Sequence, residues 1–159
     1  MYKFKIICVG KLKDEYFKDA QSEYLKRLSK YADINLFEVK DEKIFANSSL
    51  SEDEIVKDKE FVNISKYISP NDYVILLDLN GEEYDSIEFS KHFENIIDTK
   101  SNIVFIIGGS LGFSSKAYKI AKEKIKLSRL TFTHQMSRII LLEQIYRSFK
   151  IINNETYHK

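Results

Sequence analysis

The stretch Asn102–Ser114, which reads NIVFIIGGSLGFS, decides the fold class of this chain. Its first part, Ile103–Ile107, is a continuous apolar run rich in β-branched residues, the pattern of a strand that is buried on both faces. Gly108 and Gly109 follow at once. Bare backbone just past the carboxyl end of such a strand lets a ligand come close where a side chain would block it. The stretch therefore predicts a buried parallel strand with a binding crevice at its end.

Outward from this stretch, short apolar runs alternate with segments of helical spacing. Strands are predicted at residues 3–9, 34–39, 73–79 and 103–107. Helices are predicted at residues 14–31, 51–68, 86–97, 114–124 and 134–152, with a short extended piece within 125–132. Ser51, with Glu54 three residues on, is interpreted as the cap of the second helix, and Asn80-Gly81 as the end of the third strand. The alternation predicts an α/β fold, with one domain over residues 1–159 and a parallel sheet covered by helices on both faces.

Composition limits the class of protein. The chain has 159 residues, 43% of them hydrophobic and 31% charged, which is ordinary for a globular domain. We find no signal peptide and no apolar run of membrane-spanning length, so a cytoplasmic protein without membrane association is expected. The single cysteine, Cys8, lies in an apolar strand pattern and is expected to be a buried thiol. The net charge of +1 gives no global argument for nucleic acid, so any such argument must come from local clustering.

Several kinds of chemistry are disfavoured. The glycine turn is followed by no Gly-Lys-Ser/Thr and does not fit G-x-G-x-x-G. The three histidines have no metal-ligand spacing, so no metal site is predicted, and no G-x-S-x-G elbow is present. On spacing alone, the glycine turn is as consistent with a tight strand-to-helix turn as with a ligand site.

Two surfaces suggest partners. Residues 116–126 hold five lysines and one acid beside the glycine turn, which is typical of a solvated helix face but also suits an RNA-facing patch, to which Lys11 and Lys13 could add. The final helix, 134–152, is more apolar than one core face requires, which favours a homodimer. Its Glu143 and Arg147 stand at ion-pair spacing.

Taken in order, a set of motifs resembles one family. The motifs are Val9-Gly10-Lys11-Leu12-Lys13, Ile107-Gly108-Gly109-Ser110-x-Gly112, Leu127-Ser128-x-Leu130-Thr131-Phe132-x-His134-Gln135, Arg138, Glu143-Gln144-x-Tyr146-Arg147 and Tyr157-His158-Lys159. In combination they resemble the RlmH family, which are 23S rRNA (pseudouridine-N3)-methyltransferases of the SPOUT superfamily. The resemblance spans essentially the whole chain. Two departures are Thr133, where many relatives have proline, and Leu111, at a position that is often polar.

The resemblance implies a fold, a cofactor and partners. It implies an α/β domain with a C-terminal deep trefoil knot, an exception to the rule that chains avoid threading. It further implies a homodimer that binds S-adenosyl-L-methionine and methylates N3 of a pseudouridine in helix 69 of 23S rRNA, within the assembled ribosome. The positions that match the family's cofactor site are Leu77, Gly108, Gly109, Ser128, Arg129, Leu130, Thr131, Phe132 and Thr133.

Four residues are candidates for the reacting centre: His134, Arg138, Tyr157 and His158. The imidazole of His158 is of a type that accepts a proton near neutral pH, and Tyr157 could stack on the target nucleoside. Which group acts as the base stays open at this point. Two other classes also stay open: a ribosome-binding module without catalysis, and a different nucleotide-dependent α/β enzyme.

Overall fold

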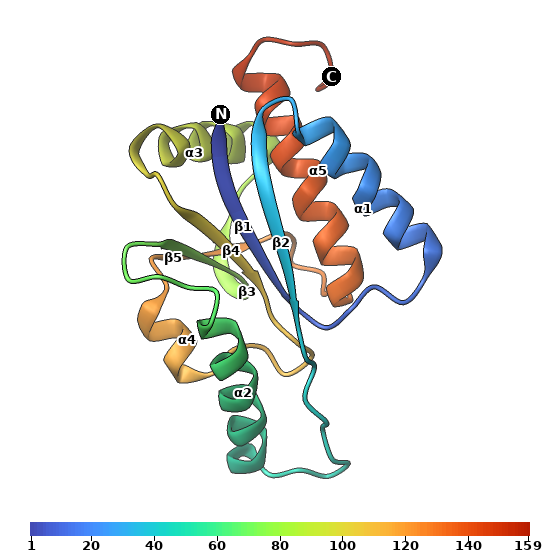
Figure 1. Ribbon diagram of the computed structural model, residues 1–159, viewed down its shortest axis with the longest axis vertical. Helices are drawn as coiled ribbons and strands as arrows, with labels where there is room; N and C mark the ends of the chain where they lie inside the picture. Colours follow the sequence, from blue (N-terminus) through green and yellow to red (C-terminus); the bar gives the residue numbers. More distant parts are fainter.

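The computed structural model describes all 159 residues and contains one five-stranded sheet, in which every pair of neighbouring strands is parallel. The strands are β1 (Tyr2–Val9), β2 (Ala32–Val39), β3 (Tyr73–Glu83), β4 (Ile103–Ile107) and β5 (Glu123–Lys126). The helices are α1 (Glu15–Leu28), α2 (Leu50–Ser65), α3 (Ser86–Thr99), α4 (Ser115–Ile120) and α5 (His134–Ile152). The strand order is β2-β1-β4-β3-β5, which places the predicted strand β4 at the centre (Figure 1). The α/β prediction is confirmed.

Helices cover both faces of the sheet, because alternate residues of each buried strand point to opposite sides. On one face, Phe4, Ile6 and Cys8 of β1 lie in a cluster that includes buried residues of α3 and α5. On the other face, Ile7 and Val9 of β1 pack in a second cluster with residues of α2 and α4. Figure 1 shows α1 lying along α5, with α2 and α4 together in another part of the molecule. No helix is both long and apolar enough to span a lipid bilayer.

The helix expected at residues 114–124 is wrong in length. α4 ends at Ile120, Ala121 adopts an extended conformation (ψ 136°), and the amide of Lys122 donates to the carbonyl of Val74 at 2.8 Å. The chain leaves the helix because the edge of β3 offers unpaired backbone groups, and β5 pairs with them. Helical spacing in the lysine-rich segment could not reveal this competing partner.

The third strand also differs from its expected end at residue 79. β3 runs on to Glu83, with a register shift between Leu77 and Glu82, both of which lie opposite Ile125. Gly81 permits the extension, since a Cβ there would lie 2.6 Å from the backbone carbonyl carbon of Lys124. The glycine interpreted as a strand end instead allows two backbones to approach closely.

The cap of α2 is two residues earlier than predicted. Ser49 caps the helix: the side chain of Ser49 accepts from the amide of Glu52 at 3.2 Å, and the Glu52 carboxylate accepts from the Ser49 amide. The same Ser-x-x-Glu pattern occurs at both places, and the structure uses the first of the two.

Candidate functional site

The candidate site lies at the edge of the sheet where the parallel strands end. The register places Cys8 of β1 and Leu77 of β3 on either side of Ile107, the last residue of β4. The turns that follow β1 and β4 therefore leave the sheet next to each other. In open α/β sheets, this edge is where ligands bind.

Gly109 is packed so closely that even a Cβ at its position would press on its neighbours. A Cβ there would lie 3.2 Å from each carboxylate oxygen of Glu60, on α2, and 3.2 Å from Cγ1 of Val9. Its φ is not positive, so the requirement for glycine is one of space and not of backbone strain. The predicted ligand turn is thus backed directly by a carboxylate.

The loop Leu127–Thr133 connects β5 to α5 and lines an open cavity of about 350 Å³. The cavity is bounded by Glu83 and Tyr84 on one side and by Leu127, Ser128, Arg129 and Leu130 on the other. Ser128 Oγ accepts from the amide of Leu130 at 3.0 Å, and Thr133 Oγ1 caps α5 by accepting from the amide of Met136 at 3.3 Å. Three of the six predicted cofactor residues of this loop therefore line a hollow.

His134, the first residue of α5, packs flat against the backbone of Gly10. A Cβ at Gly10, whose φ is +102°, would lie 2.9 Å from Cε1 of the imidazole. The His134 Nδ1 atom is buried and has no hydrogen-bond partner. Burial, followed by the charge of Arg138, lowers the pKa of His134 below its ordinary value, so the ring is neutral at neutral pH.

Arg138 is completely buried and holds the turns at this edge together. Its Nη1 donates to Glu38 at 2.7 Å and to Gln21 at 3.0 Å, and its Nη2 donates to the carbonyl of Gly10 at 3.1 Å. The guanidinium is 0% exposed, so it has no open path to a macromolecule in the protomer. The structure brings Arg138 to the predicted site but in a role that orients the backbone.

Glu60 was missed by the sequence analysis, although it is the acid closest to the glycine turn. The residue is 4% exposed, and its Oε2 accepts from the amide of Glu42 at 3.1 Å. Burial raises the pKa of its carboxyl to about 7, with the nearby Asp41 also acting to raise it. The signal in the sequence was its spacing, since Val56, Glu60 and Ile64 stand four residues apart on one helix face.

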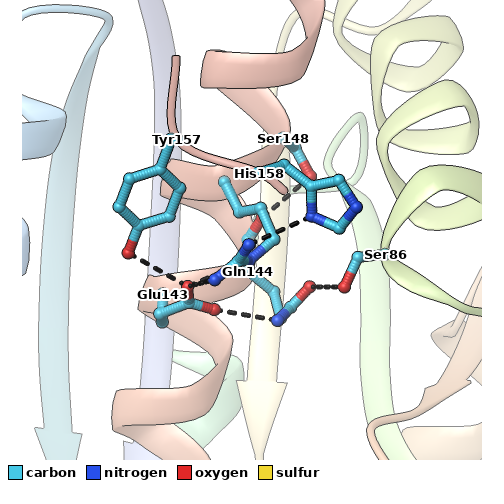
Figure 2. A network of polar contacts seen from close by, with 7 residues as sticks. Ser86, Glu143, Gln144, Ser148, Tyr157 and His158 are labelled. Atoms are coloured by element: carbon cyan, nitrogen blue, oxygen red, sulfur yellow. Dashed lines mark hydrogen bonds and ion pairs between the residues drawn. The ribbon is translucent and has the colours of Figure 1, made fainter.

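The tail residues Tyr157 and His158 follow α5 and fold back against its second half (Figure 2). Tyr157 donates from its hydroxyl to Glu143 at 3.1 Å, and Nδ1 of His158 lies 3.0 Å from Nη1 of Arg147. Glu143 and Arg147 also form the predicted ion pair, at 2.6 Å. Burial, then the Glu143 charge, raises the pKa of Tyr157 to about 12, so the phenol stays protonated at neutral pH.

The four candidates for the reacting centre fall into two groups. His134 and Arg138 lie at the site edge, whereas Tyr157 and His158 contact Glu143 and Arg147. At 1.5 Å of rise per residue, these contacts are about 14 to 20 Å farther along α5 than His134. Within one protomer, the tail does not reach the glycine turn.

The lysine-rich segment does not form one helix face, because it is divided between α4 and β5. Lys116 lies 3.7 Å from a carboxylate oxygen of Asp58, and Lys126 lies 3.5 Å from one of Glu83. Part of its positive charge is therefore compensated within the protomer, which weakens the argument for an RNA-facing patch.

Known proteins resemble this chain in sequence over nearly its whole length. A family model described as "Predicted SPOUT methyltransferase" matches residues 2–158. A protein of Clostridium kluyveri named "Ribosomal RNA large subunit methyltransferase H" is 55% identical over 155 residues, covering 97% of this chain and 98% of the relative. Proteins with the same name from Ruminiclostridium cellulolyticum and Clostridium tetani are 48% and 50% identical, over 99% and 97% of this chain and 99% and 98% of those relatives.

Proposed function

The chain belongs to the SPOUT methyltransferase family, together with the relatives compared above, and on that premise we propose that it methylates ribosomal RNA of the large subunit. The family assignment confirms the resemblance that the motifs predicted. The observation that carries the proposal is the Gly109 turn, whose bare backbone lies at the ligand edge of the sheet.

We propose S-adenosyl-L-methionine as the methyl donor. The residues present fit such a group, since bare backbone at Gly109 and the cavity lined by Ser128, Arg129 and Leu130 offer amides, carbonyls and space for a nucleoside. The proposed contacts are Leu77, Gly108, Gly109 and the loop residues Ser128, Arg129, Leu130, Thr131, Phe132 and Thr133. The cofactor supplies a methyl group that is already activated on a sulfonium, so the protein chiefly aligns the reactants and removes a proton.

The proposed acceptor is N3 of a pseudouridine in helix 69 of 23S rRNA, within the assembled ribosome of the cytoplasm. N3 carries an imide proton that must leave as the methyl group arrives. The neutral imidazole of His134, which lies on the side of the methyl donor, suits the group that accepts this proton. Tyr157 and His158 suit contacts with the base, through stacking and hydrogen bonds. Arg138 orients the turn at Gly10 and acts through it.

A homodimer is part of this proposal. Much of α5 is already covered within one protomer, with Leu141, Leu142, Ile145 and Phe149 buried, so its apolar surface alone is a weaker argument than the sequence suggested. The stronger argument is the distance between the tail and the glycine turn. A second subunit could bring its Tyr157 and His158 to the pocket of the first.

We also propose that the chain is knotted at the C-terminal third. β5 lies at one edge of the sheet, beyond β3, whereas His134 lies against Gly10 at the end of β1. The loop Leu127–Thr133 must therefore pass the ends of β3 and β4. Glu83 ends the β3 extension and Tyr84 follows it, and both line one cavity with this loop, consistent with its passage beneath that connection.

The test of the function is methyl transfer to ribosomes from cells that lack this protein. Purified protein with labelled S-adenosyl-L-methionine should label 23S rRNA in assembled ribosomes, and mass spectrometry should place the methyl group on a pseudouridine of helix 69. Cofactor binding without any transfer would favour a ribosome-binding module instead. Binding of nicotinamide dinucleotides in place of S-adenosyl-L-methionine would favour a different α/β enzyme.

A further inference from the structure

Glu60 is a buried carboxylate without a cationic partner in the protein. It is 4% exposed, and none of the ion pairs of the structure includes it. Its recorded hydrogen bond comes from the neutral amide of Glu42. Other acids of α2 are paired: Glu54 lies 3.0 Å from Lys57, and Asp58 lies 3.7 Å from Lys116. A buried carboxyl group in such a place requires either a proton or a cation from elsewhere.

The surroundings of Glu60 point to the source of that cation. Both of its oxygens face Gly109, 3.2 Å from the position that a Cβ would take. The titratable groups that face it are Asp41 and Glu42, which are acidic and make its ionisation harder. Val9 and Gly109, its neighbours at the ends of β1 and β4, bring no charge. Without a ligand a proton neutralises this carboxyl, and because its neighbours bring no cation, a cation that stabilises the ionised form has to come from the ligand side.

Glu60 also lies at the end of the site where the reaction is proposed. Val9, which borders it, precedes Gly10, and Gly10 is covered by the imidazole of His134. Asp41, which faces Glu60, acts electrostatically on His134 as well. The cavity proposed for the nucleoside is lined by Glu83 and Ser128, which do not belong to the helix that carries Glu60. This position favours the sulfonium of the cofactor over its adenosine as the group near Glu60.

We propose that the Glu60 carboxylate is the counter-charge of the sulfonium in the methyl donor and lets the site distinguish donor from product. This inference rests on the proposed function. A sulfonium has no N–H or O–H to donate, so an anion near it is the available means of recognition. Once the methyl group has left, the sulfur is a neutral thioether and the attraction is lost. The site then favours S-adenosylmethionine and releases S-adenosylhomocysteine.

The experiment measures the affinities of the full-length protein for both compounds by calorimetry at pH 8, without any RNA. We expect Glu60→Gln to weaken the binding of S-adenosylmethionine about tenfold and that of S-adenosylhomocysteine less than about threefold. Glutamine keeps the shape and can still accept from the amide of Glu42, so a purely structural role would leave the ratio unchanged. Glu54→Gln, on the same helix but paired with Lys57, is the matched control and should also leave the ratio unchanged.

A second readout is the effect of pH on the wild-type protein. Because a bound cation favours the ionised form of Glu60, donor binding should release a proton, and donor affinity should rise between pH 6 and 8 while product affinity stays flat. This difference should vanish in Glu60→Gln.

Two outcomes would overturn the inference. An equal loss of affinity for both ligands in Glu60→Gln would place the carboxylate near the amino-acid ammonium, which donor and product share. An unchanged affinity ratio would remove Glu60 from recognition altogether. A wild-type protein that binds neither compound would instead contradict the proposed function, so the two failures can be told apart.

Discussion

The two ends of α5 each hold an Arg–Glu ion pair, but the pairs serve different purposes. At the first end, Arg138 reaches Glu38 on β2, a hundred residues away in the chain, and is 0% exposed. At the second, Arg147 pairs with Glu143 one turn away on the same helix, and both are partly exposed. The first pair assembles the edge that carries the glycine turns, whereas the second helps to hold the tail. In the site proposed above, one protomer thus builds the donor side and presents the acceptor side elsewhere.

The largest effect should come from removing residues 157–159. We expect methyl transfer to ribosomes to fall by more than about a thousandfold, because the aromatic and imidazole groups proposed for the acceptor side are lost. Cofactor affinity should stay within about threefold, since the tail contacts α5 and not the glycine turn. Calorimetry and ribosome labelling measure the two effects. Full activity of the shortened chain would discard the acceptor-side role.

Gly109→Val should lower the affinity for the cofactor by at least about a hundredfold. The new side chain would meet the Glu60 carboxylate and Val9 at the ligand edge. The control is Gly112→Ala, because a Cβ at Gly112 meets nothing within 4 Å and adds only the strain of a φ of +83°. A folded Gly109→Val protein that binds the cofactor like wild type would contradict the pocket assignment.

Mixing these two defective chains tests whether the site is shared. A heterodimer of a tail-deleted subunit and a Gly109→Val subunit contains one intact turn and one intact tail. If the tail of one subunit serves the pocket of the other, activity should return in one of its two sites. No recovery in a heterodimer shown to form would contradict a shared site.

The two arginines should differ in their effect on stability. Arg138→Met leaves Glu38 without its partner and Gly10 without its donor, and we expect a loss of about 3 kcal/mol in the free energy of unfolding. Arg147→Met breaks a partly exposed pair within one helix and should cost less than about 1 kcal/mol. Urea denaturation compares the two. Equal losses would show that the buried pair is no more important to the fold than the surface pair.

The last comparison concerns Glu60 and pH in the absence of ligand. Its folded-state pKa of about 7 lies above the ordinary 4.5, so the folded state binds more protons than the unfolded state between these values. Stability from this group is complete below about pH 4.5 and is lost as the pH rises through 7. Glu60→Gln should therefore be more stable than wild type at pH 8, by about 3 kcal/mol, and similar to it at pH 4.5. A difference that is independent of pH would contradict the buried, unpaired state of this carboxyl.

Much of the fold was predictable because its signals are local. The apolar run at β4, the glycines after it and the i,i+4 pair Glu143–Arg147 follow from period and spacing, and the structure contains all three. The strand in β5 was harder to predict, because its four residues pair with a partner about 48 positions earlier in the chain. Local helical spacing in the lysine-rich segment therefore competed with an edge of β3 that the sequence does not reveal.

The sequence by itself determined the family and the candidate site residues, since the glycines, the hydroxylated loop and the terminal Tyr157-His158 form a recognisable order. Only the tertiary structure decided how these residues are distributed. It buried Arg138 against Glu38, placed Glu60 behind Gly109, and kept the tail away from the turn. The physical reason is that a residue type limits what a group can do, whereas its pKa, its partners and its access depend on neighbours that are distant in the chain.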